Sequence, residues 1–298
     1  GSFFATTADS FDFGNGLQFS ASNPQAAPLL TMSVAPGLQY GANPGNINSS
    51  GNLTVEKDLT LAGGNLDLQG TITANEEMFL VSSNNITGNA NYSAGGSLNV
   101  LAGGSVALGN VDIQGTNTTN NTIEAFNSKP VSANLANVAL SDSTTMTEVP
   151  ALNVRAGIDW TQFQGTSITP NSVTSTATSA DITVGEILNL SGFDSGLGQI
   201  LLTNQDIPNQ NLAGSIQTGL ISTYGHVFLD SKGNITTTSA IDTTISNNDA
   251  GDISLLAEGN ITTGGALRSN VSSGTGNSGN IKLKRTGEIN TTAGDIVS

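Results

Sequence analysis

The sequence predicts an all-β fold, a parallel β-helix in which short strands wind as a solenoid and loops project from the coils. Three observations lead to this prediction. A short unit recurs at a near-constant spacing, each copy carries apolar residues two positions apart, and no apolar stripe is long enough for an amphipathic helix. Each coil of a solenoid has an apolar side that only the next coil can cover, so a repeated unit of this kind favours stacking.

The clearest repeats lie in the C-terminal third of the chain. Residues 251–263 align with residues 279–291 at an offset of 28 positions, and residues 226–237 form an earlier copy, offset by 26. A fourth copy begins at residue 199. The alignment makes two sets of positions equivalent, namely Leu229, Leu255 and Leu283, and Ile235, Ile261 and Ile289. Antiparallel sandwiches need no such recurrence, and propeller blades recur at roughly 40 to 50 residues, so a parallel β-helix fits best.

Within each copy the apolar residues alternate. Val227 and Leu229 are two positions apart, as are Ile253 and Leu255, and such residues point to the same face of a strand. Gly-Asn or Gly-Asp then turns the chain, because both residue types tolerate a positive φ. Each copy is therefore expected to contain a short strand closed by a tight turn.

The N-terminal half repeats as well. Residues 65–70 recur as residues 110–115, 45 positions later, and residues 61–64 recur as residues 101–104. We expect one coil for every ~20 to 28 residues, with neighbouring coils ~4.8 Å apart. Roughly a dozen coils would then form a rod about 60 Å long.

Two stretches interrupt this regularity. Residues 116–149 are predicted to leave the helix as an excursion, and residues 204–211 to form a second, smaller loop. Four of the eight prolines, Pro24, Pro28, Pro36 and Pro44, lie in the first 44 residues. The N-terminal segment is therefore predicted to be a cap or a lateral extension.

The composition argues against several classes of function. Eight basic residues stand against 23 acidic ones, a net charge of −15, whereas a nucleic-acid site needs a clustered basic face. The closest approach to one is Lys282, Lys284 and Arg285. No apolar run approaches the ~20 residues that span a bilayer, and the absence of Cys removes disulfides and thiolate metal sites. Residues 1–10 lack the pattern of a signal peptide, and we interpret the chain as a processed fragment rather than an intracellular protein.

The N-terminal residues resemble a known family. GSFFATTADSFDFG (residues 1–14), together with residues 19–25 and 28–30, resembles the haemagglutination-activity domain of two-partner secretion exoproteins of the filamentous haemagglutinin-like kind, with the cyanobacterial type closest. Residues 59–68 resemble late coils of the same domain, and the C-terminal Gly-Asn-Ile-Thr-Thr units resemble the repeats that follow it. The family's Asn-Pro-Asn-Gly signature is missing, and Asn43-Pro44-Gly45 does not replace it.

The resemblance implies a right-handed parallel β-helix, export through an outer-membrane transporter, and a location on or beyond the cell surface. On this basis residues 1–115 are expected to form the C-terminal part of a haemagglutination-activity domain. Residues 116–180 are expected to form an irregular excursion with some coils of the helix, and residues 181–298 a repetitive stem.

Parallel β-helices also include enzymes that act on acidic polysaccharides, so catalysis needs its own test. Such hydrolases need paired carboxylates, and Glu76-Glu77 is the only adjacent acidic pair. Adjacent residues on a strand point to opposite faces and cannot act together as a catalytic pair. We therefore interpret Glu76-Glu77 as part of a solvated turn. Asp67 and Asp112 are interpreted as surface residues beside apolar ones, and His226, the only His, as a solvent-facing turn residue.

No catalytic, cofactor-binding or metal-binding residue is therefore predicted. Zinc sites built from His and Cys are excluded by the counts. The many carboxylate and carbonyl oxygens are compatible with Ca²⁺, but the Gly-Gly-x-Gly-x-Asp nonapeptide is absent, so no cofactor is expected.

Three residues form the one candidate for ligand contact, Arg155, Asp159 and Trp160, which lie close together in the sequence. Trp160 offers a ring that could stack on a sugar, although a lone Trp more often closes a core or anchors a loop. The frequent Asn-x-Ser/Thr triplets are interpreted as stacked side chains that hydrogen-bond between coils rather than as glycosylation sites; they include Asn48, Asn52, Asn85, Asn91, Asn234 and Asn260.

Three hypotheses about function follow. The preferred one is a secreted, surface-associated exoprotein that acts without catalysis as an adhesin or an extracellular structural rod. Its partners would be the transporter during export and then a surface carbohydrate or protein, or further copies of itself. The alternatives are a β-helical polysaccharide lyase or hydrolase, and a filament subunit that stacks end to end.

Overall fold

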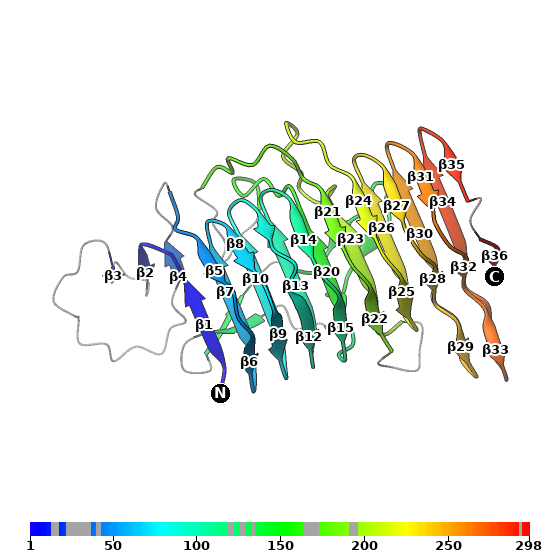
Figure 1. Cartoon of the computed structure of the whole chain (residues 1–298), viewed down its shortest axis with the longest axis horizontal. Coiled ribbons are helices and arrows are strands. Elements are labelled where there is room, and N and C mark those ends of the chain that lie inside the picture. Colours follow the sequence, from blue (N-terminus) through cyan, green and yellow to red (C-terminus); the bar gives the residue numbers. More distant parts are fainter. Residues whose placement is uncertain are drawn as a thin grey trace.

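The computed structural model describes residues 1–12, 18–21, 37–39, 43–118, 122–125, 129–132, 135–163, 173–190, 196–291 and 294–298. In these residues every regular element is a β-strand, and most strands form three parallel sheets that extend along the long axis of the molecule (Figure 1). None of the described residues forms a helix that is long and apolar enough to cross a bilayer.

Each of the three main sheets has nine strands. Sheet 1 contains, in stacking order, β1 (Phe3–Thr6), β7 (Leu59–Gly63), β10 (Met78–Ser82), β13 (Leu98–Ala102), β20 (Leu152–Arg155), β23 (Ile200–Thr203), β26 (Val227–Ser231), β30 (Ile253–Ala257) and β34 (Ile281–Arg285). Sheet 2 contains β5 (Ile47–Ser49), β8 (Leu66–Leu68), β11 (Ile86–Thr87), β14 (Val106–Leu108), β21 (Ile182–Val184), β24 (Ile216–Thr218), β27 (Ile235–Thr237), β31 (Ile261–Thr263) and β35 (Ile289–Asn290). Sheet 3 contains β6 (Leu53–Val55), β9 (Thr71–Ala74), β12 (Asn91–Ala94), β15 (Val111–Ile113), β22 (Ile187–Asn189), β25 (Ile221–Thr223), β28 (Ile241–Asp242), β32 (Leu267–Arg268) and β36 (Ile296–Val297).

One strand from each sheet makes one coil, so the sheets define nine coils, from β1–β5–β6 (coil 1) to β34–β35–β36 (coil 9). This confirms the predicted parallel β-helix. The C-terminal repeat alignment is also confirmed, because Leu229 pairs with Leu255 and Leu255 with Leu283 in parallel register. Nine coils stack to roughly 40 Å, which is shorter than the predicted rod because the excursions take up so many residues.

The N-terminal repeats, unlike the C-terminal ones, do not mark equivalent positions in the coils. Leu66 lies on β8 of sheet 2, whereas Val111, its match 45 positions later, lies on β15 of sheet 3. Residues 61–64 and 101–104 are one position out of register in sheet 1. Leu80 of β10 pairs with Leu61 on one side and with Val100, not Leu101, on the other. A shift of one residue reverses the face of a strand. Leu61 therefore points into the helix, while Leu101 packs on its outside.

The core lies inside the coils. The first, third and fifth residues of a sheet 1 strand point inward, as Ile253, Leu255 and Ala257 do, and they meet the buried ends of the sheet 2 and sheet 3 strands. Tight corners join these strands. At the Gly88 corner φ is +101° and a Cβ atom would lie 1.9 Å from the Leu68 carbonyl oxygen, so only glycine fits there.

The irregular segments lie outside the coils. In the predicted excursion, residues 116–149, the described residues include two antiparallel pairs outside the three main sheets, β16 (Thr122–Ala125) with β17 (Lys129–Ser132) and β18 (Val138–Ala139) with β19 (Thr145–Met146). The predicted loop at 204–211 separates β23 from β24, and the described residues between β20 and β21, which lie mostly in the expected irregular region 116–180, form no strand of the three main sheets. A short parallel pair, β29 (Ile245–Ser246) with β33 (Val271–Ser273), adds to the last coils.

Three described strands that lie between β1 and β5 in the sequence form a small antiparallel sheet. Its strands are β2 (Ser10–Asp12), β3 (Gln18–Ser20) and β4 (Gly37–Gln39), with β2 in the centre. Figure 1 shows this sheet beside β1, at the N-terminal end of the stack, where the sequence predicts a cap or a lateral extension. Pro24, Pro28 and Pro36 lie outside the described residues.

Candidate functional surface

The outer face of sheet 1 is covered by the rest of the chain. From β7 to β30 its outward side chains are buried, apart from the half-buried Phe228. We call this set the covered face; it comprises Thr60, Ala62, Phe79, Val81, Asn99, Leu101, Asn153, Arg155, Leu201, Thr203, Asp230, Ser254 and Leu256. Leu135, Val149 and Trp160 pack on its first half, and Val138, Leu140 and Met146 on its second half.

Arg155, one of the three candidate ligand contacts, lies inside this interface. Its side chain is 2% exposed, and its Nη1 lies 2.7 Å from Oδ2 of Asp206, which is 8% exposed. The Arg155 Nε also donates to Asn153, and its Nη2 donates to the Leu135 carbonyl. Burial lowers the pKa of the Arg155 guanidinium, and the Asp206 carboxylate opposes that shift. The guanidinium therefore joins coil 5 to the excursion and to the 204–211 loop.

A buried polar column continues from Arg155 toward the N-terminal coils. Asn153 donates to Asn99 at 3.1 Å, and Asn99 donates to the Ser97 hydroxyl at 2.9 Å. Ser97 in turn donates to the Glu77 carboxylate. Burial raises the pKa of Glu77, although the Ser97 hydrogen bond opposes this. Buried polar groups of this kind stabilise only when each has a partner, and here each has one.

The other two candidate residues have partners of their own. The Trp160 indole is 1% exposed, donates to the Ser82 carbonyl at 3.2 Å and packs edge-on against Phe163 at 5.3 Å. It anchors the segment after β20 on the covered face and has no exposed ring face. Asp159 accepts from the backbone N–H and the hydroxyl of Thr161, and these bonds lower its pKa. The structure therefore does not bring the three side chains together as one site.

The excursion also reaches the C-terminal coils. The Ser141 backbone N–H and hydroxyl both donate to the Asp230 carboxylate in coil 7, at 2.8 and 2.6 Å. Lys282 Nζ in coil 9 donates to Asp142 Oδ2 at 2.5 Å. Burial would raise the pKa of Asp142, but the hydrogen bonds from Lys282 and Thr144 outweigh it and lower that pKa to about 2. The turn at residues 140–144 thus fastens the excursion to coils that follow it by up to 140 positions.

A ladder of side chains runs through all nine coils at the corner before sheet 2. Each side-chain oxygen accepts the backbone N–H of the corresponding residue in the next coil, at 2.7–3.1 Å. The ladder residues are Asn46, Asn65, Asn85, Ser105, Asp181, Ser215, Asn234 and Asn260, ending at the N–H of Glu288. This confirms the predicted stacking between coils for Asn85, Asn234 and Asn260, and Asn52 and Asn91 do the same at the next corner.

The remaining candidate groups are held in similar ways. His226 Nδ1 accepts the Asp252 N–H at 2.8 Å, and Asp252 accepts the Asn280 N–H at 2.6 Å, so His226 occupies the expected repeat position at a corner. Glu76 is exposed beside Lys57 at 3.7 Å, while Glu77 belongs to the buried column. No group of three His, Cys, Asp or Glu side chains in the described residues could hold a metal ion.

The outer faces of sheets 2 and 3 are open and polar. Their exposed or half-buried outward residues include Asp67, Thr87, Thr183, Gln217, Thr236 and Thr262 on sheet 2, and Thr54, Thr73, Ser93, Asp112, Leu188 and Ser222 on sheet 3. A hollow of about 280 Å³ on sheet 3 is lined in part by Ser93, Asp112, Glu186 and Leu188.

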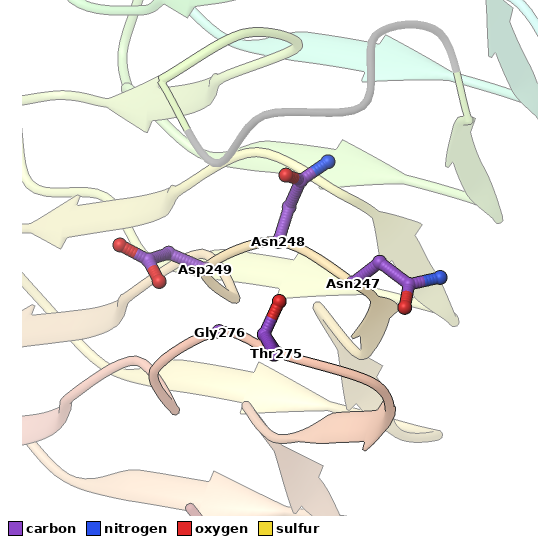
Figure 2. Close-up of a pocket in the computed structure, with 5 residues that line it drawn as sticks. All are labelled: Asn247, Asn248, Asp249, Thr275 and Gly276. Carbon is purple, nitrogen blue, oxygen red and sulfur yellow. The ribbon is translucent and has the colours of Figure 1, made fainter.

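A second, polar hollow of about 330 Å³ lies where the chain after β29 faces the chain after β33. Its lining is Asn247, Asn248, Asp249, Thr275 and Gly276 (Figure 2). Figure 2 shows the Asn247, Asn248 and Asp249 side chains pointing in different directions. Asp249 Oδ1 is already engaged by the Asn277 backbone and side chain. These groups do not converge on one point, as a ligand site would require.

Sequence reasoning missed the groups that fix the covered face. Asp206 lies 51 positions from Arg155, and Asp142 lies 140 positions from Lys282. The one available signal in the sequence was the small number of basic residues. A chain with only eight of them has few positively charged partners for its carboxylates.

Comparison with known proteins adds one finding. Residues 1–148 match the family model of the TPS (two-partner secretion) secretion domain. No curated protein and no solved structure matches the chain. The match supports a two-partner secretion exoprotein, indicates a secreted protein, and implies an outer-membrane transporter as its export partner.

Proposed function

We propose, from the match of residues 1–148 to the TPS secretion domain, that this chain is part of a surface-associated exoprotein that acts as an adhesin or an extracellular structural rod. Its work is binding and display, without catalysis. The residues that resemble the haemagglutination-activity domain favour the cyanobacterial, filamentous haemagglutinin-like type.

The structure supports the proposal in two ways. The coils stack through local pairing, so a chain that crosses an outer membrane unfolded can build the helix coil by coil on the far side. The open faces of sheets 2 and 3 present hydroxyl, amide and carboxylate groups suited to polar partners.

Export is the property to test first. The chain would be fused to a signal peptide and expressed with and without an outer-membrane transporter of the two-partner secretion type, and the protein in the medium would be measured by immunoblot. We expect the chain in the medium only when the transporter is present. The matched control is residues 149–298 behind the same signal peptide, which lack the matched region and should stay in the periplasm. Equal release with and without the transporter would refute the proposal.

The absence of catalysis is tested separately. Purified protein would be incubated with pectin and alginate, and new reducing ends or unsaturated products would be measured. We expect no turnover, and sustained turnover would favour the polysaccharide-degrading alternative.

A further inference from the structure

One segment of the excursion packs against both halves of the helix. This segment, residues 135–149, contains the antiparallel pair of β18 and β19, and we call it the latch. Its buried side chains are separated by exposed polar ones such as Thr145 and Thr147; the buried ones are Leu135, Val138, Leu140, Met146 and Val149. The latch therefore has one apolar side, which packs on the covered face of sheet 1.

The apolar side of the latch is divided between two separate clusters. Leu135 and Val149 belong to the first cluster, whose sheet 1 members lie in coils 2–4 and are Ala62, Phe79, Val81 and Leu101. Val138, Leu140 and Met146 belong to the second cluster, whose sheet 1 members lie in coils 6–8 and are Leu201, Phe228 and Leu256. In the sequence the latch lies between coil 4 and coil 5, so it contacts coils that precede it and coils that follow it.

Hydrogen bonds to coil 7 make closure of the latch an all-or-none event. Asp230 lies on the covered face with 0% of its side chain exposed, and the Ser141 N–H and hydroxyl both donate to its carboxylate. Burial raises the pKa of Asp230, and the hydrogen bonds from Ser141 oppose that shift. A latch that covered Asp230 without these donors would leave a buried carboxylate unsatisfied, which is costly. The latch is therefore stable when it is fully closed or when it leaves Asp230 in water.

Stacking alone couples distant coils weakly, because each repeat of a solenoid contacts only its neighbours. Coils 3 and 8 are five strand spacings apart in sheet 1, or about 24 Å. Substitutions more than roughly 7–10 Å apart usually act independently. The latch bypasses the intervening coils, since a single short segment packs on both regions of the covered face.

We propose that residues 135–149 are a latch that closes only after coils 6–8 have folded, and that then couples these coils to coils 2–4. The match to the TPS secretion domain ends at residue 148, inside the latch, so the latch ties the matched region to coils beyond it. The first cluster needs residues 62–101 and the second needs residues 201–256. A partly exported chain thus keeps the latch incomplete, whichever end emerges first. This inference does not depend on an adhesive or structural role for the protein.

Hydrogen exchange of the purified full chain, followed by mass spectrometry, tests the coupling because it measures each coil separately. Leu255→Ala weakens the core of coil 8. Through the closed latch it should also speed the exchange of the slowest amides in coils 2–4, by at least about tenfold. The double variant L140A/M146A removes latch contacts with coils 6–8. In that background Leu255→Ala should change exchange in coils 2–4 by less than about twofold, while still speeding it in coil 8.

The matched control is T145A/T147A, on the exposed side of the same segment, which should transmit the effect of Leu255→Ala as the wild type does. Far-UV circular dichroism checks that each variant keeps its fold. If L140A/M146A does not fold, Leu140→Ala alone replaces it and should reduce the transmitted effect at least about threefold.

Three results would overturn the inference. They are the absence of any effect of Leu255→Ala on coils 2–4 of the otherwise wild-type chain, an equal transmitted effect with and without the latch substitutions, and an equal loss of transmission in T145A/T147A. Exchange in the purified protein does not depend on a transporter. These results would therefore reject the latch alone, whereas transporter-independent release would reject the proposed function alone.

Discussion

The ion pair between Arg155 and Asp206 offers the sharpest test of how the excursions are held on the helix. Substituting Arg155→Met keeps most of the side-chain volume but leaves the Asp206 carboxylate, 8% exposed, without its partner at 2.7 Å. Removing one member of a buried pair costs about 3–5 kcal/mol, because the remaining charge is desolvated and unpaired. The Asn153 side chain and the Leu135 carbonyl lose a donor as well.

Urea unfolding followed by tryptophan fluorescence measures this loss, because Trp160 lies in the same interface. With an m-value of about 2–3 kcal/mol/M, the midpoint should fall by on the order of 1–2 M. The control is Arg268→Met, whose partner Asp242 lies at 4.0 Å, with the Arg268 side chain exposed and the Asp242 side chain half-buried, and it should cost less than about 1 kcal/mol. The double variant R155M/D206N should recover part of the loss, since no lone charge remains buried. Equal effects of Arg155→Met and Arg268→Met would refute the reasoning.

Three further predictions concern the helix and its fastening. Leu255→Ala, at a fully buried core position, should lower the free energy of unfolding by about 2–5 kcal/mol, measured in urea. Asn234→Ala leaves the Asn260 N–H without its acceptor at 2.8 Å and should cost about 1 kcal/mol, measured the same way. Asp142 has a pKa lowered from 3.8 to about 2, so its contribution to stability is full above about pH 4 and is lost as the pH falls to about 2. The difference in Tm between the wild type and Asp142→Asn should accordingly be present at pH 6 and vanish near pH 2.

Each of these predictions has its own control. For Asn234→Ala it is Thr262→Ala, an exposed position on sheet 2 that should change stability by less than about 0.5 kcal/mol. For the core it is Leu255→Met, which conserves volume and should cost less than about 1.5 kcal/mol. For Asp142 it is Lys282→Gln, which removes the other side of the same contact and should show the same pH dependence. A pH-independent difference for Asp142→Asn would contradict the argument about Asp142. Equal losses for Asn234→Ala and Thr262→Ala, or for Leu255→Ala and Leu255→Met, would contradict the arguments about the ladder and the core.

The fold was predictable where the repeated segments align position by position. In the C-terminal coils the spacing is 26–28 residues and equivalent leucines and isoleucines pair directly. In the N-terminal coils the spacing drops to 19–20 residues. The similar short segments that recur there therefore lie on different sheets or one residue out of register. Each coil contains three short strands of similar sequence, one in each sheet. A match between two short segments therefore does not show which sheet either segment belongs to.

The candidate ligand residues show the limit of the same reasoning. Arg155, Asp159 and Trp160 are close together in the sequence, but alternation and turning send their side chains to different partners: Asp206, Thr161 and Ser82. The basic residues of β34 were visible in the sequence, yet the contact of Lys282 depends on Asp142, which belongs to the excursion.

The sequence by itself determined the coil, because strand alternation, glycine corners and Asn ladders act between residues within one coil or the next. Only the tertiary structure decided what lies on the outer face of sheet 1. Its contacts join residues 51, 89 and 140 positions apart, and no periodic pattern encodes them. They form where the excursion buries an outer face that mixes apolar residues such as Phe79 and Leu101 with polar ones such as Arg155 and Asp230.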